Sequence, residues 1–146
     1  MSSLDKVREF RVASGQVAPE GLKMPSRGDR ELLIRLLLEE VCELAEELGV
    51  DFEAAVQGRI RRPVTAVCEH EVKCIAHVCK EAADVKYVAD QLFVAMGIPE
   101  AVFDEVHASN MSKFVDGRPV KRPDGKTMKG PHYRPANIAR ALGLDV

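Results

Sequence analysis

Apolar residues recur at helical spacing along much of the chain. Between positions 32 and 48, leucines follow one another at threes and fours and form one stripe at roughly 100° per residue: Leu32, Leu33, Leu36, Leu37, Leu44 and Leu48. We expect Asp29 to be the N-cap of this helix and Gly49 to stop it. The pattern therefore predicts a helix over about 29–48.

The same reading divides the rest of the chain. A short helix is expected over 4–14, a long one over about 69–96 before Gly97, and a third over 99–113, with Pro99 in its first turn. Residues 114–146 are rich in Gly, Pro and Lys, with turns expected at Asp116-Gly117 or Asp124-Gly125 and a last helical piece over 135–142. We predict an all-α fold in one domain over 1–146, an antiparallel helical bundle with an irregular tail.

Acidic side chains interrupt the apolar stripes of both long helices. Glu40 and Glu43 are three positions apart within the leucine stripe, and Glu81 and Asp84 have the same spacing within the second stripe. Carboxylates at core positions are costly to bury unless a cation lies near them. Four such groups on two packed helices would suit Mg²⁺ or Mn²⁺, which usually serve phosphoryl chemistry. The residues predict a divalent-metal site without specifying the reaction.

Other polar residues extend this hypothesis. Glu39 precedes the first acidic pair and would orient or deprotonate an attacking water. Asn110 and Lys113 continue the inward face of the helix over 99–113. Lys113 would then neutralise a triphosphate, and Asn110 would contact a base or sugar edge.

Two other interpretations of these residues stay open. The acids could be ordinary surface groups paired with Arg35, Lys73 and Lys80. A zinc site is the other, because five thiol or imidazole side chains lie close together in the sequence: Cys68, His70, Cys74, His77 and Cys79. No CxxC pair is present, however, and the helical angles place Cys79 away from Cys74 and His77, which should face the core. We expect His77 to support a metal shell rather than to bind the ion.

Composition narrows the class of protein. The chain has 146 residues, of which 46% are hydrophobic and 30% charged, with a net charge of −2. These values fit a globular domain and argue against a generally basic nucleic-acid binder. There is no apolar run long enough to span a membrane, no signal-peptide pattern, and no disulfide framework among the cysteines. We therefore expect a cytoplasmic protein without membrane or nucleic-acid partners.

The acidic pattern also resembles a known signature. Glu39-Glu40-x-x-Glu43 followed by Glu81-x-x-Asp84 is similar to the motif of the all-α nucleoside triphosphate pyrophosphohydrolases, the MazG-like superfamily. Segments 106–113 (VHASNMSK) and 124–135 resemble the C-terminal region of its short members, the phosphoribosyl-ATP-pyrophosphohydrolase-like and dimeric-dUTPase-like proteins. The likeness extends over about residues 32–141 and departs from the usual spacing between Glu43 and Glu81.

The resemblance implies a specific activity. It indicates Mg²⁺-dependent hydrolysis of a nucleoside triphosphate, a dNTP or a non-canonical NTP, to the monophosphate and pyrophosphate, in house-cleaning of the nucleotide pool. It implies a homodimer or homotetramer. By the resemblance, Glu39 assists the water. The four acids that bind the metal are Glu40, Glu43, Glu81 and Asp84. The four residues that contact the nucleotide are Asn110, Lys113, Lys129 and Tyr133. The alternatives are a phosphoribosyl-ATP pyrophosphohydrolase and a non-catalytic nucleotide-binding helical module.

Overall fold

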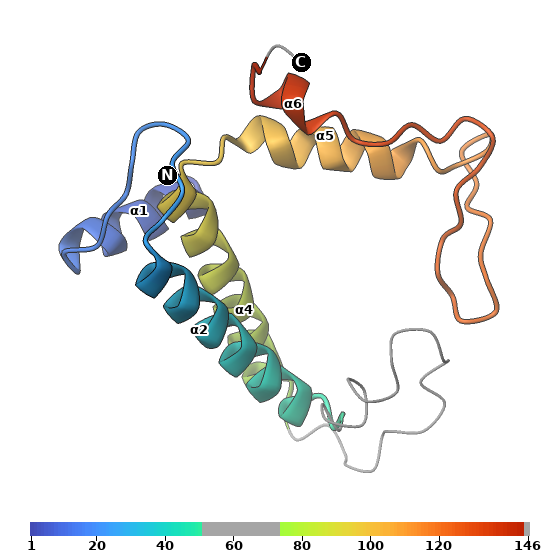
Figure 1. The fold of residues 1–146 in the computed structure, drawn as a ribbon. Coiled ribbons are helices and arrows are strands. Elements are labelled where there is room, and N and C mark those ends of the chain that lie inside the picture. The colour runs from blue at the N-terminus through green and yellow to red at the C-terminus, as the bar shows by residue number, and fades with distance from the viewer. Residues whose placement is uncertain (51–73, 145–146) are drawn as a thin grey trace. The chain divides into compact units, whose positions relative to one another are not determined.

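The computed structural model of the chain describes residues 1–50 and 74–144. Its helices in these ranges are α1 (Ser3–Ala13), α2 (Arg27–Glu47), α4 (Ile75–Met96), α5 (Glu100–Met111) and α6 (Ile138–Ala141) (Figure 1). Over the same ranges, extended pairing is confined to isolated bridges. The described chain is therefore mostly helical, as expected for an all-α protein. No helix in this part of the chain is long and apolar enough to cross a bilayer.

Contacts divide the chain into two compact units, Met1–Gly97 and Ile98–Val146. The first unit contains α1, α2 and α4, and the second contains α5 and α6. The single domain and the bundle expected from the sequence stay predictions.

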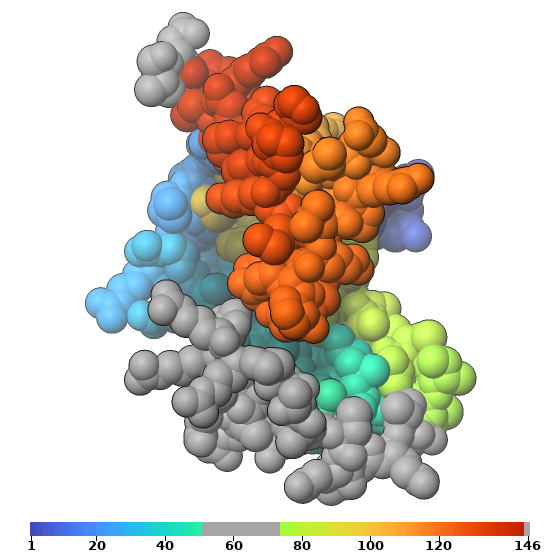
Figure 2. Space-filling model, turned by 90° about the vertical axis from the view of Figure 1, so that its right-hand side faces the viewer, coloured from blue at the N-terminus to red at the C-terminus, as the bar shows by residue number. Residues whose placement is uncertain are grey.

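In the first unit, α2 and α4 pack along each other and run in opposite directions (Figure 1). The residues that bury their side chains in this unit include Leu33 and Ala45 of α2, and Val88 and Val94 of α4. The C-terminal turns of α2, coloured teal, lie beside the N-terminal turns of α4, coloured yellow-green (Figure 2). This antiparallel packing decides which acids of the two helices can meet.

The start of α2 differs from the prediction. Ser26, and not Asp29, is the N-cap, and its hydroxyl oxygen accepts a hydrogen bond from the Asp29 N–H at 3.1 Å. The assignment of Asp29 was wrong because the serine three positions earlier already accepts that amide, which places Asp29 in the first turn, where a carboxylate favours the helix dipole. The end of the helix is as predicted, with Gly49 following at a φ of 70°.

α1 packs against α4 and ties the loop after it to the same unit. Val7 of α1 is 1% exposed. Arg11 is 3% exposed; it donates through Nε to the Val17 carbonyl oxygen at 3.1 Å and through Nη1 to Gln91 Oε1 of α4 at 3.4 Å. A buried guanidinium thus connects α1, its following loop and α4.

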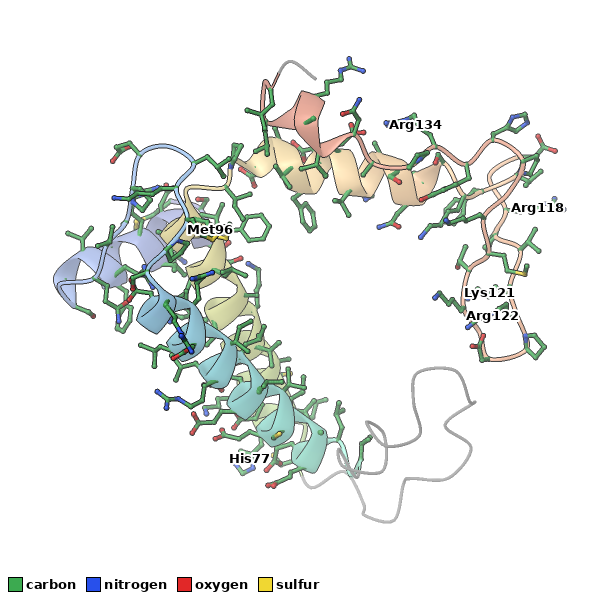
Figure 3. All side chains as sticks on the ribbon, in the orientation of Figure 1. His77, Met96, Arg118, Lys121, Arg122 and Arg134 are labelled. Carbon is green, nitrogen blue, oxygen red and sulfur yellow. The ribbon has the colours of Figure 1, made fainter. Side chains whose placement is uncertain are left out.

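α4 ends at Gly97, as the sequence predicted. This glycine has a φ of 65°, and an added Cβ would lie 2.3 Å from the Gly21 carbonyl oxygen. The loop before α2 lies against this point, where the Lys23 N–H donates to the Met96 carbonyl oxygen at 2.9 Å. Figure 3 marks Met96 at this end of the helix. Gly97 therefore serves both the left-handed turn and the close approach of the loop.

The second unit carries a tight turn that the sequence predicted. Asp116 and Gly117 both have positive φ, 48° and 72°, and the flanking Val115 and Arg118 exchange two backbone hydrogen bonds of 2.9 Å. This is the two-residue hairpin turn that Asp-Gly favours. The other predicted turn lies within a second isolated bridge, between residues 121 and 127. Arg118 lies on this hairpin segment in Figure 3.

α6 is attached to α5 through Glu105. Glu105 Oε1 accepts a hydrogen bond from the Asn137 N–H at 2.9 Å and another from the Arg134 guanidinium. These donors, first the Asn137 N–H and then Arg134, lower the pKa of Glu105. The last helical piece does not start at Pro135: Asn137 is the N-cap of α6, and its side-chain oxygen accepts a hydrogen bond from the Arg140 N–H at 3.0 Å.

Candidate metal centre

Three carboxylates from the two packed helices meet at one point. Glu40 and Glu43 come from α2 and Glu81 comes from α4, and one oxygen of each lies within 4.8 Å of the others. The antiparallel packing produces this meeting, because it sets the C-terminal half of α2 beside the N-terminal half of α4. Several carboxylate oxygens in such proximity are the ligands that Mg²⁺ and Mn²⁺ prefer. The donor set therefore fits a hard divalent cation.

The acids of this centre are unequally buried. The Glu81 side chain is 13% exposed, Glu40 is half-buried, and Glu43 is exposed. Burial raises the pKa of Glu40, and the negative charges of Asp84 and Glu43 raise it further. Glu39, the predicted water-orienting residue, is exposed on α2 beside Glu40. A cation among these groups would offset both the burial and the repulsion.

Asp84 is the predicted ligand that does not join the three glutamates. Its Oδ2 lies 2.9 Å from Lys80 Nζ, and the same ammonium lies 3.0 Å from Glu81 Oε2. The hydrogen bonds to Asp84 and to Glu81 raise the pKa of Lys80, in that order of size. Asp84 is thus held by a lysine of its own helix, one turn before it.

Lys80 is the residue that the metal-site hypothesis left out. The sequence indicated the pairing of Lys80 with Asp84, because a lysine four positions before an aspartate on a helix commonly forms an ion pair with it. The alternative interpretation named Lys80 as a partner of the acids, and that pairing is confirmed. Of the other two partners named there, Arg35 is exposed and Lys73 lies outside the described residues.

His77 and Cys74 do not face the core, so that expectation was wrong. The His77 side chain is 67% exposed, and its Nδ1 lies 3.7 Å from Glu47 Oε2. Figure 3 labels His77. Since Glu47 is the last residue of α2, His77 lies at the margin of the helix pair. Cys74, the N-cap of α4, and Cys79 are both exposed. Cys68 and His70, the remaining zinc candidates, lie outside the described residues.

The residues predicted to contact a nucleotide all lie in the second unit. Lys113 Nζ donates a hydrogen bond to Asn110 Oδ1 at 2.6 Å, next to the C-terminus of α5. Asn110 is exposed and Lys113 is half-buried. The Lys129 ammonium lies 4.5 Å from the ring centroid of Tyr133, a cation–π contact. The structure therefore pairs Asn110 with Lys113, and Lys129 with Tyr133.

No family model and no curated protein matches this chain. The resemblance to the pyrophosphohydrolases therefore rests on the residue pattern and stays a prediction. The meeting of three carboxylates from two helices is an observation independent of any relative.

Proposed function

We propose that this chain is a Mg²⁺-dependent nucleoside triphosphate pyrophosphohydrolase of the all-α, MazG-like type, working in the cytoplasm on a dNTP or a non-canonical NTP. The observation that carries the proposal is the meeting of Glu40, Glu43 and Glu81 within 4.8 Å, from two antiparallel helices. The order of acidic pairs along the chain supports it, since it resembles the signature of that superfamily.

The charge of the centre argues for a cation between the protein and its substrate. A triphosphate is a polyanion, and a cluster of carboxylates repels it. With Mg²⁺ or Mn²⁺ held by Glu40, Glu43 and Glu81, the same cluster attracts it. The bound ion would supply charge neutralisation and Lewis acidity at the phosphates. The acids themselves serve to hold the ion, and they do not recognise the anion directly.

The resemblance to the pyrophosphohydrolases implies the remaining roles. Glu39, exposed and adjacent to Glu40, would take a proton from the water that attacks between the α- and β-phosphates. Lys113 would pair with a phosphate and Asn110 with the base or sugar. Lys129 and Tyr133 would close over the phosphates. The products are the monophosphate and pyrophosphate.

We also propose that the protein is a homodimer or homotetramer. Ile34 and Leu38 of α2 are 51% and 52% exposed. Ile34 and Leu38 line a shared surface groove on α2. Grouped apolar side chains on a surface often mark association sites. Light scattering should give a multiple of the 16.1 kDa chain mass, whereas a mass of one chain at every concentration would contradict the assembly.

The activity is tested by pyrophosphate release from a panel of dNTPs, NTPs and phosphoribosyl-ATP, first with Mg²⁺ and then with EDTA. We expect equal amounts of monophosphate and pyrophosphate from at least one compound, and none in EDTA. Glu40→Gln protein purified in parallel excludes a contaminating hydrolase. Release of orthophosphate would mean that a different bond is cut. Silence across the whole panel would contradict the proposed activity.

A further inference from the structure

The acidic centre already has a cation beside it. Lys80 Nζ lies 2.9 Å from Asp84 Oδ2 and 3.0 Å from Glu81 Oε2. Glu81 also belongs to the group of three glutamates, so this one carboxylate links the ammonium to the candidate metal ligands. The Lys80 side chain is 61% exposed, and its four-carbon stem leaves it able to turn towards solvent.

The ammonium acts on the whole cluster and not only on its nearest partners. Burial raises the pKa of Glu40, and so do the charges of Asp84, Glu43 and Glu81, whereas the charge of Lys80 lowers it. A divalent ion placed among the glutamates would be repelled by that ammonium and would compete with it for the oxygens of Glu81. The Lys80 ammonium and a divalent ion therefore cannot both bind the oxygens of Glu81 at full strength.

We propose that Lys80 is an exchangeable counter-cation of this centre: it holds Asp84 and Glu81 until a divalent ion displaces it and releases Asp84 as a further ligand. The inference rests on the proposed function, because it concerns how the same centre takes up its metal. Lys80 is then a positioning residue that stabilises the protein without metal and weakens metal binding by competition. This role explains why Asp84 pairs with a lysine while the other three acids meet.

A matched control for Lys80 exists on the same helix. Lys86 pairs with Asp90, also four positions later, and donates to Ser3 Oγ of α1 at 2.9 Å. Lys80 and Lys86 are each 61% exposed. Lys80→Gln and Lys86→Gln therefore each remove one positive charge from α4. The first removes two ion pairs, to Asp84 and Glu81, and the second removes one, to Asp90, and only the first change lies at the acidic centre.

The test is the dissociation constant of Mn²⁺, measured by electron paramagnetic resonance on the full chain. We expect Lys80→Gln to bind Mn²⁺ about tenfold more tightly than the wild type, because a competing charge is gone. Lys86→Gln should bind within about twofold of the wild type, since screening by solvent weakens charges at longer range. Lys80→Arg keeps the positive charge, so it should bind Mn²⁺ about as weakly as the wild type does.

A second readout separates this role from a simple ion pair. In EDTA, Lys80→Gln should melt at a lower temperature than Lys86→Gln, because the carboxylates are left without their cation, and Mn²⁺ should reverse that order. Equal Mn²⁺ affinity in Lys80→Gln and the wild type would overturn the exchange while leaving the metal centre standing. Failure of both proteins to bind Mn²⁺ would overturn the centre and the exchange together. Binding by Lys80→Gln alone would support the competition but contradict metal-dependent activity of the wild type.

Discussion

Glu40 lies in an environment that disfavours its own negative charge. It is half-buried beside other acids, and both burial and those charges raise its pKa. We therefore predict that Glu40→Gln lowers pyrophosphate release about 100-fold or more, because it removes a ligand of the ion on which the chemistry depends. In EDTA the same variant should be as stable as the wild type or more stable, because a repelled charge is gone.

The control for this prediction is Glu31→Gln on the same helix. Glu31 is exposed and pairs with Arg27 at 2.7 Å, so its loss should cost about 0.5 kcal/mol or less. Its pyrophosphate release should equal that of the wild type. Wild-type rates in Glu40→Gln would remove Glu40 from the centre.

Glu105 gives a prediction for pH. Its pKa is lowered by the Asn137 N–H and by Arg134, so the folded state favours the carboxylate more than the unfolded state does. The resulting stability is present above the ordinary glutamate pKa of about 4.5 and is lost as the pH falls through the lowered pKa. The protection of the Asn137 amide against hydrogen exchange, relative to the intrinsic rate at each pH, should therefore fall at acidic pH, and this protection should be less sensitive to pH in Glu105→Gln. Identical pH profiles in both proteins would contradict this attachment of α6.

At the scale of elements, Gly97 joins the end of α4 to the loop before α2. Gly97→Ala should destabilise the protein by about 1–3 kcal/mol from its left-handed backbone alone, and by more because the added Cβ meets the Gly21 carbonyl oxygen. Gly15→Ala is the matched control, since Gly15 has a φ of 71° but nothing within 4 Å of an added Cβ. Urea unfolding measures both variants. Equal losses would contradict the close contact at Gly97.

The elements also show what could be read from the sequence and what could not. Leucine spacing and the glycine stops predicted the presence of α2 and the ends of α2 and α4, because these depend on local geometry. The N-cap of α2 was missed because Ser26 and Asp29 are both suitable caps and only the folded backbone decides between them. The prediction that His77 faces the core was wrong for another reason. Angular counting assumes that a neighbouring helix packs along the whole of α4, but α2 ends beside His77.

The candidate centre was predictable to a similar degree. Two acidic pairs inside apolar stripes indicated that carboxylates would meet, and three of the four do. The capture of Asp84 by Lys80 depends on side-chain rotamers and on competition between a local ion pair and a distant cluster, which a linear pattern does not resolve.

At the scale of the whole molecule, metal binding should increase the free energy of unfolding. An ion that binds only the folded chain stabilises it by about 2.7 kcal/mol at one hundred times its dissociation constant. We therefore predict that Mg²⁺ raises the melting temperature by several degrees in a concentration-dependent way. The double variant Glu40→Gln, Glu43→Gln should lose this shift. A melting temperature that is the same in Mg²⁺ and in EDTA would contradict the centre.

The most direct measurement is the anomalous scattering of Mn²⁺ in crystals of the full chain. Glu40, Glu43 and Glu81 should surround one strong peak, with a carboxylate oxygen of each bonded to the ion. The electron density of the same crystals should show Asp84 released from Lys80. Absence of a peak at saturating Mn²⁺, or a peak elsewhere with these three carboxylates unbound, would contradict the account.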